Sequence, residues 1–237
     1  MKQLRIESPK TLYRYRPLAH SWANTLTEIT GMLWFSQSEG LNDPFDGLGY
    51  SLKYNRVLKA ANANQSIPVE NIWSVACFTT KWNNPTMWAH YANNYTGICL
   101  GYEKKELVKH VSDINKEAHH PSYTIKGAFL KPMEYVTGIP HTFKSIEEPM
   151  TIKTRHWEYE DEWRLGLLHS YGNANIKDKG APYLFENALT EIIYTNKLKR
   201  NELITIKKIA QVTNHTIKFY KINIEKGMRV MTREEIA

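Results

Sequence analysis

The chain has 237 residues, 42% of them hydrophobic and 23% charged, which is typical of a globular protein long enough to bury a sizeable core. Residues 1–17 hold no apolar segment of the signal-peptide kind, and no stretch approaches the roughly 18 uncharged apolar residues of a membrane helix, so we expect a cytoplasmic protein without a membrane partner. The formal net charge of +7 favours a polyanionic partner, above all nucleic acid. Cys77 and Cys99 both lie in apolar runs, which indicates buried thiols rather than a disulfide.

Hydrophobic periodicity and turn residues predict the elements in chain order. Residues 12–16 alternate and are aromatic, which indicates a strand, and a short helix between residues 20 and 30 should end at Gly31. Further strands are expected at 32–36, 74–80, 98–103, 128–136, 160–168, 191–195 and 216–224, and further helices at 56–65, after Pro85, at 104–116 and at 198–213. Because these elements are mixed without regular βαβ alternation, we expect an α+β fold with mixed, mainly antiparallel sheets and flanking helices, in a single domain over residues 1–237.

The stretch RHWEYEDEWRL at 155–165 concentrates acid in a basic protein. If residues 157–165 form a strand, Glu158, Glu160 and Glu162 share one face and lie roughly 6–7 Å apart in succession. Carboxylates this close raise the pKa of at least one of them, which is a common preparation for acid–base catalysis. The alternative is a solvated strand face with no chemical role.

The opening strand LYRYR places Arg14 and Arg16 on one face, opposite Tyr13 and Tyr15. Arginines fixed on a strand can bind a phosphate or a carboxylate in bidentate fashion. The alternative is that they pair for structural reasons with acids such as Asp43, Asp46 or Glu162.

The segment LNDPFDG at 41–47 has the residues of a turn. Asn42 and Asp43 are expected to brace this loop, which could line a pocket beside the opening strand. A metal site is not expected, because no His or Cys lies at ligand spacing.

The segment at 77–103 is rich in aromatic residues. On the helix after Pro85, Met87 and Tyr91 are neighbours at i and i+4, and Trp88 and Tyr91 could stack on a planar ligand ring. The alternative is a helix that packs in the core and exposes one edge to solvent. Neither cysteine has an adjacent base, so a cysteine hydrolase is not expected. The sequence also lacks the common phosphate-binding and zinc-protease motifs.

Taken in order, LYRYRP, LWFSQSEGLNDPFD, PTMWAHYANNYTGICLGYE and HWEYEDEWRL resemble a bacterial family known only as a domain of unknown function. This resemblance spans about residues 12 to 225 and implies no activity by itself.

A remoter likeness concerns the order of features. The pieces YRY, GMLWFS, FTTKWNNPTM, DEWRLGL and ALTEIIYT are similar in order to the DarT-type ADP-ribosyltransferases, toxins that modify nucleic-acid bases. This likeness singles out Glu162, which stands just before the hydrophobic part of its strand, although Trp163 and Arg164 follow it where apolar residues would be usual.

The likeness implies an ADP-ribosyltransferase-like fold and NAD as a substrate. Glu162 would stabilise the positive charge that develops on the ribose, and Glu160 would be the second acid. Arg14 and Arg16 would hold the phosphates. The remaining predicted binding residues are Tyr15, Asn42, Asp43, Trp88 and Tyr91.

Three functions remain open on the sequence. The first is an NAD-consuming transferase that modifies nucleic acid or protein, as a toxin or phage-defence effector with a possible antitoxin partner. The second is a non-catalytic module that binds nucleic acid or a nucleotide. The third is a hydrolase or nuclease whose acids bind a divalent metal.

Overall fold

The computed structural model describes residues 8–18, 22–37, 40–43, 73–118, 125–140, 147–169, 180–213, 216–225 and 230–236. The helix expected at 56–65 and the loop residues 44–49 lie outside the described residues. None of the helices in these described ranges has the length and apolar character that crossing a bilayer requires.

The described strands form one large sheet and one small one. The large sheet consists of β1 (Thr11–Arg16), β2 (Met32–Ser36), β3 (Trp73–Thr79), β4 (Ile98–Glu103), β5 (Ile125–Pro132), β8 (Glu162–His169), β9 (Gly180–Leu184), β10 (Leu189–Tyr194), β11 (Lys218–Glu225) and β12 (Val230–Ile236). Its order is β12-β11-β10-β4-β1-β3-β2-β9, and β8 and β5 branch from β3. The small sheet pairs β6 (Glu134–Val136) with β7 (Ile152–Thr154).

Most strand pairs are antiparallel. The exceptions among the described strands are β10 with β11 and β6 with β7, which are parallel. The described helices are α1 (Trp22–Ile29), α3 (Pro85–Tyr91), α4 (Lys104–Glu117) and α5 (Arg200–Thr213), with the 3-10 helices η4 (Glu148–Met150) and η5 (Arg155–Glu160). The expected α+β class with a mixed, mostly antiparallel sheet and flanking helices is therefore confirmed.

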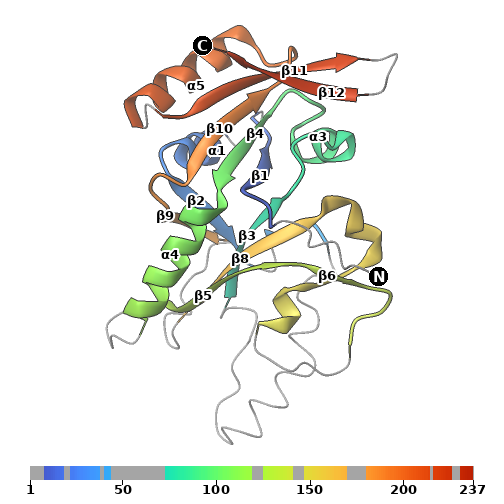
Figure 1. Ribbon diagram of the computed structural model, residues 1–237, viewed down its shortest axis with the longest axis vertical. Helices are drawn as coiled ribbons and strands as arrows, with labels where there is room; N and C mark the ends of the chain where they lie inside the picture. Colours follow the sequence, from blue (N-terminus) through green and yellow to red (C-terminus); the bar gives the residue numbers. More distant parts are fainter. Residues whose placement is uncertain are drawn as a thin grey trace, which may run out of the picture.

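The alternation of the strands divides the core between the two faces of the sheet. On one face, Leu12 of β1 packs with apolar residues of α1, α4 and α5. On the other face, Tyr13 and Tyr15 pack with Met87 and Trp88 of α3. Figure 1 shows α1, α4 and α5 on one side of β1 and β4, and α3 on the opposite side. The predicted alternation of the opening strand is confirmed.

Two helix boundaries follow from local chemistry. Helix α1 is followed by Gly31 with φ of +92°, a left-handed conformation that glycine adopts without steric cost. Helix α3 begins with Pro85 at its first position, and the Asn84 side chain accepts hydrogen bonds from the first-turn amides of Thr86 and Met87. Both boundaries agree with the sequence.

The acidic stretch does not form the continuous strand that was considered for residues 157–165. Residues Arg155–Glu160 form η5, Asp161 adopts a left-handed conformation with φ of 47°, and β8 begins at Glu162. Aspartate is among the few residues that tolerate this conformation, so the chain can turn sharply there. Glu158 is exposed, whereas Glu160 and Glu162 are buried. The prediction that all three glutamates share one strand face was therefore wrong.

Candidate functional site

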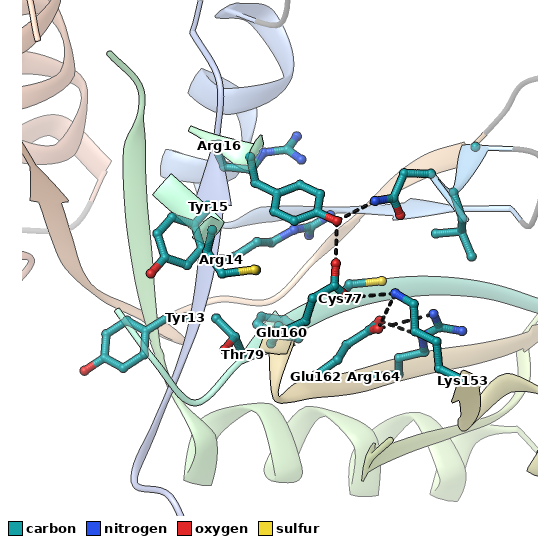
Figure 2. A pocket seen from close by; sticks show the side chains of 16 residues that line it. Tyr13, Arg14, Tyr15, Arg16, Cys77, Thr79, Lys153, Glu160, Glu162 and Arg164 are labelled. Carbon is teal, nitrogen blue, oxygen red and sulfur yellow. Dashed lines mark hydrogen bonds and ion pairs between the residues drawn. The ribbon is translucent and has the colours of Figure 1, made fainter. Parts of the chain in front are cut away.

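A cavity of about 200 Å³ lies between the opening strand and the acidic stretch. Side chains from β1, residues 40–42, β3, α3, β7, η5 and β8 line it, and Figure 2 shows Arg14 and Arg16 across from Glu160 and Glu162. Seven predicted site residues line this cavity: Arg14, Tyr15, Arg16, Asn42, Tyr91, Glu160 and Glu162. The structure thus brings the early arginines and the late acids together.

The sheet register explains this meeting. Thr79, at the end of β3, pairs with Tyr13 of β1 on one side and with Glu162 of β8 on the other. Tyr13 and Thr79 are the only paired positions recorded between the described residues of β1 and β3. Residues 149 positions apart in the sequence therefore flank the same strand end.

Two arginines share a single carboxylate on the β1 side of the cavity. Arg14 Nη1 lies 3.1 Å and Arg16 Nη2 lies 3.3 Å from Oε1 of Glu28 in α1. Arg14 Nη1 and Arg16 Nε are buried and make no hydrogen bond. Burial lowers the pKa of Arg16. The attraction of Glu28 opposes this decrease, and the repulsion from Arg14 adds to it. This side therefore has two guanidinium groups against one carboxylate, an excess of positive charge that suits an anionic ligand.

Glu162 is held as a carboxylate by two cations. Its Oε1 accepts a hydrogen bond from Arg164 Nε at 2.7 Å, and its Oε2 accepts one from Lys153 Nζ at 3.0 Å. All three side chains are at most 4% exposed. Burial alone would raise the pKa of Glu162, but Arg164 and Lys153 outweigh it and lower the pKa to about 2. Glu162 is therefore a fixed negative charge.

Glu160 has a different environment two residues earlier. Its Oε2 accepts from Lys153 Nζ at 2.6 Å, and its Oε1 accepts from the Tyr91 hydroxyl, which in turn accepts from Asn42. Burial raises the pKa of Glu160; Lys153 opposes this rise and Glu162 adds to it. Because Glu160 takes up a proton more readily than an ordinary glutamate, it is suited to proton exchange.

The phenol and thiol groups of the cavity wall stay neutral. Burial raises the pKa of Tyr15 and of Tyr91. Burial also raises the pKa of the Cys77 thiol, and Glu162 adds to this rise. The cavity therefore has a cationic side at β1, a side at β7, η5 and β8 where two carboxylates are paired with Lys153 and Arg164, and neutral hydroxyl and thiol groups.

Two predicted binding residues do not line the cavity. Trp88 is fully buried, lies edge-on to Tyr15 and stacks on Tyr95, so it belongs to the core and has no free ring face for a ligand. Asp43 is 3% exposed and lies outside the cavity wall. Neither residue contributes to the wall of this cavity: Trp88 serves packing, and Asp43 is buried beside the lining residue Asn42.

Three charged residues of the site were not predicted from the sequence. Glu28 pairs with both arginines of β1, in place of the acids expected for them. Lys153 and Arg164 set the charges of the two glutamates. The departure of Arg164 from the apolar pattern of its strand was the only sequence signal for any of them. Among the described residues, no group of three or more His, Cys, Asp and Glu side chains is arranged to hold a metal ion.

Residues 87–165 match the family model described as "Protein of unknown function (DUF2971)". This confirms the expected resemblance to an uncharacterised family. The DUF2971 match contains Tyr91, Lys153, Glu160, Glu162 and Arg164, but it leaves out the arginines of β1. No curated protein and no solved structure matches the chain.

Proposed function

We propose that this protein is an NAD-dependent ADP-ribosyltransferase with an ADP-ribosyltransferase-like fold, acting in the cytoplasm on nucleic acid or protein. Its role would be that of a toxin or phage-defence effector, with an antitoxin as a partner. The observation that carries the proposal is the single cavity in which Arg14 and Arg16 lie across from Glu160 and Glu162.

The reaction breaks the bond between nicotinamide and C1′ of the ribose. The electron pair leaves with nicotinamide, and positive charge develops on the ribose. The ionised Glu162 carboxylate faces the cavity, where it would stabilise that charge more than it stabilises the ground state. The acceptor then bonds to C1′ and loses a proton, and Glu160 would receive it.

The arginines of β1 suit the phosphates of NAD. They bring two guanidinium groups against one carboxylate, and two of their nitrogens make no hydrogen bond. A cavity of about 200 Å³ is smaller than the roughly 300–1,000 Å³ of pockets for drug-sized ligands. We therefore assign the cavity to the nicotinamide and its ribose, with the adenylate half extending past Arg16.

Nicotinamide release from NAD tests the proposal. Purified protein should release nicotinamide, and Glu162→Gln should lower the rate by at least about a hundredfold, since it removes the fixed negative charge. Glu162→Gln also leaves Lys153 and Arg164 buried with less compensating charge, so its folding has to be checked by circular dichroism.

Glu160→Gln is the second variant, because an amide keeps the size of the carboxyl and removes its ability to receive a proton. It should fold normally and slow transfer to an acceptor more than it slows nicotinamide release. Glu147→Gln, which breaks an ion pair with Lys131 away from the cavity, should keep full activity. Absence of nicotinamide release from the folded wild-type protein would refute the proposal.

One observation favours a second function, a non-catalytic nucleotide-binding module. Both oxygens of Glu162 are already engaged by Arg164 and Lys153, so its charge is largely neutralised. This reading predicts that NAD and ADP-ribose bind in calorimetry without turnover, and that Arg14→Ala abolishes the binding while Glu160→Gln leaves it unchanged.

A further inference from the structure

The connection between β3 and α3 holds the corner of the chain that carries Glu160. This connection, residues 80–84, touches the corner at residues 159–161 through three side chains. The Thr80 hydroxyl donates to the Asp161 carboxylate, and Lys81 pairs with the same carboxylate at 3.6 Å. Both members of the Lys81 pair are about half exposed, so that pair contributes little.

Asn84 makes the third of these contacts, and its side chain serves two elements at once. Its Oδ1 accepts from the amides of Thr86 at 2.9 Å and Met87 at 3.4 Å, which caps α3. Its Nδ2 donates to the main-chain carbonyl of Tyr159 at 2.7 Å, which holds the last turn of η5. One amide therefore joins two segments that are 75 residues apart in the sequence.

The two segments joined by Asn84 carry the two members of one hydrogen bond in the cavity. Helix α3 carries Tyr91, and η5 ends at Glu160, whose carboxylate accepts from the Tyr91 hydroxyl. The backbone N–H of Asn84, as distinct from its side chain, donates to the Tyr15 hydroxyl at 3.4 Å, which connects the same point to β1. Asn84 thus lies where three walls of the cavity meet, although it does not line the cavity.

We propose that Asn84 is a positioning residue that keeps the Glu160 carboxyl buried and hydrogen-bonded to Tyr91. The inference deepens the proposed function, on which its kinetic part rests. Without the Asn84 side-chain donor, the Tyr159 carbonyl loses this hydrogen bond and η5 is held less firmly against α3. Water can then reach Glu160.

Serine separates the two roles of Asn84. Serine caps a helix about as well as asparagine and brings no charge, but it has no donor that reaches the Tyr159 carbonyl. Asn84→Ser therefore keeps the cap of α3 and removes the hold on η5.

Asn115 offers a matched control. Its Nδ2 donates to the carbonyl of Ala128 at 3.1 Å, and its Oδ1 accepts from the amide of the same residue, so it joins α4 to β5 in the same manner. Neither residue lines the cavity. Asn115→Ser makes the same chemical change and should leave the Glu160 site untouched.

The first measurement is the titration of Glu160, followed by NMR of carbon-13-labelled glutamate and assigned by the signal lost in Glu160→Gln. Lys153 of β7, Glu162 of β8 and Tyr91 of α3 face this carboxyl, and both serine variants keep all three. In Asn84→Ser the titration midpoint should move down towards that of a solvated glutamate, because burial is what raises it. In Asn115→Ser the midpoint should stay at the wild-type value.

The second measurement is nicotinamide release. Asn84→Ser should lower kcat by roughly tenfold to a hundredfold with KM for NAD nearly unchanged, since a displaced group costs rate more than binding. Asn84→Gln, which keeps both functional groups on a longer chain, should restore part of the rate.

An Asn84→Ser protein whose Glu160 midpoint equals the wild-type midpoint would overturn the inference, as would an equal displacement in Asn115→Ser. If Glu160 titrates as expected in the wild type and the variants but the wild type releases no nicotinamide, the proposed function is refuted. The positioning role of Asn84 then stands, because the titration does not depend on NAD.

Discussion

Glu160 and Glu162 are two positions apart, yet their surroundings push their protonation in opposite directions. Lys153 contacts both carboxylates, so it does not distinguish them. The difference comes from the second partner, which is the cation Arg164 for Glu162 and the neutral hydroxyl of Tyr91 for Glu160. One lysine with two unlike acids gives the cavity a permanent charge and an exchangeable proton side by side.

The low pKa of Glu162 predicts a loss of stability in acid. The folded state holds this pKa at about 2, against 4.5 for an ordinary glutamate. The stabilisation is complete above about pH 4.5 and is lost as the pH falls towards 2, and at about 1.4 kcal/mol per pH unit it amounts to about 3 kcal/mol. Denaturant unfolding across this range should show that loss in the wild type and not in Glu162→Gln.

Glu160 should affect the pH dependence of folding stability in the opposite direction. Its folded pKa is raised above the ordinary 4.5, so its protonation stabilises the folded state as the pH falls towards about 4.5, above the range in which Glu162 loses its contribution. Glu160→Gln should therefore lack this gain above about pH 4.5 and keep the acid loss below it. An identical fall of stability in acid for the wild type, Glu162→Gln and Glu160→Gln would contradict this account.

At the scale of elements, β12 is an edge strand with polar and charged residues along much of its length. It pairs with β11 over seven positions, from Val230 to Ile236. Arg233 adds a side-chain anchor, because its Nη1 donates to Glu191 at 2.6 Å and its guanidinium lies over the ring of Tyr220 at 4.3 Å from the ring centre. Backbone pairing and one arginine hold this strand.

Arg233→Ala should release β12 while the rest of the sheet stays folded. Amide hydrogen exchange at residues 230–236 should accelerate by at least about tenfold, because a charge-assisted hydrogen bond is worth about 1.5–3 kcal/mol. Lys218→Ala, which removes an exposed pair with Glu235 on the same two strands, should change exchange much less. Equal acceleration in both variants would show that Arg233 is not the anchor.

Strand β12 and the acidic corner also show where sequence reasoning reached its limit. Alternating aromatic residues predicted β1, and a short apolar run predicted β3, which is buried along most of its length. The sequence did not predict β12, whose pattern is mostly exposed, or the left-handed turn at Asp161. The arginines and glutamates of the site were found from their residue types, but their partners Glu28 and Lys153 depend on tertiary contacts that no local pattern encodes.

At the scale of the whole molecule, the excess of positive charge bears on which molecule would accept ADP-ribose in the proposed reaction. With a formal net charge of +7, nucleic-acid binding should be driven by release of counterions from phosphates. The affinity for a labelled oligonucleotide, measured by fluorescence anisotropy, should fall by at least about tenfold between roughly 50 and 200 mM salt. NAD binding in the cavity should fall much less, since few of its contacts are with solvated charges. Oligonucleotide binding that is absent or insensitive to salt would point to a protein acceptor.

The cavity walls come partly from ahead of the segment that matches DUF2971 and partly from within it: Arg14 and Arg16 lie on β1, before the segment, and the two carboxylates lie near its end. A peptide cut to residues 87–165 would hold the acids with Lys153 and Arg164 but would lack the arginines across the cavity. During translation, the chain up to Arg164 must emerge from the ribosome before β1 and the strand that carries Glu162 can pack together. Any chemistry performed here therefore needs the chain from β1 through β8.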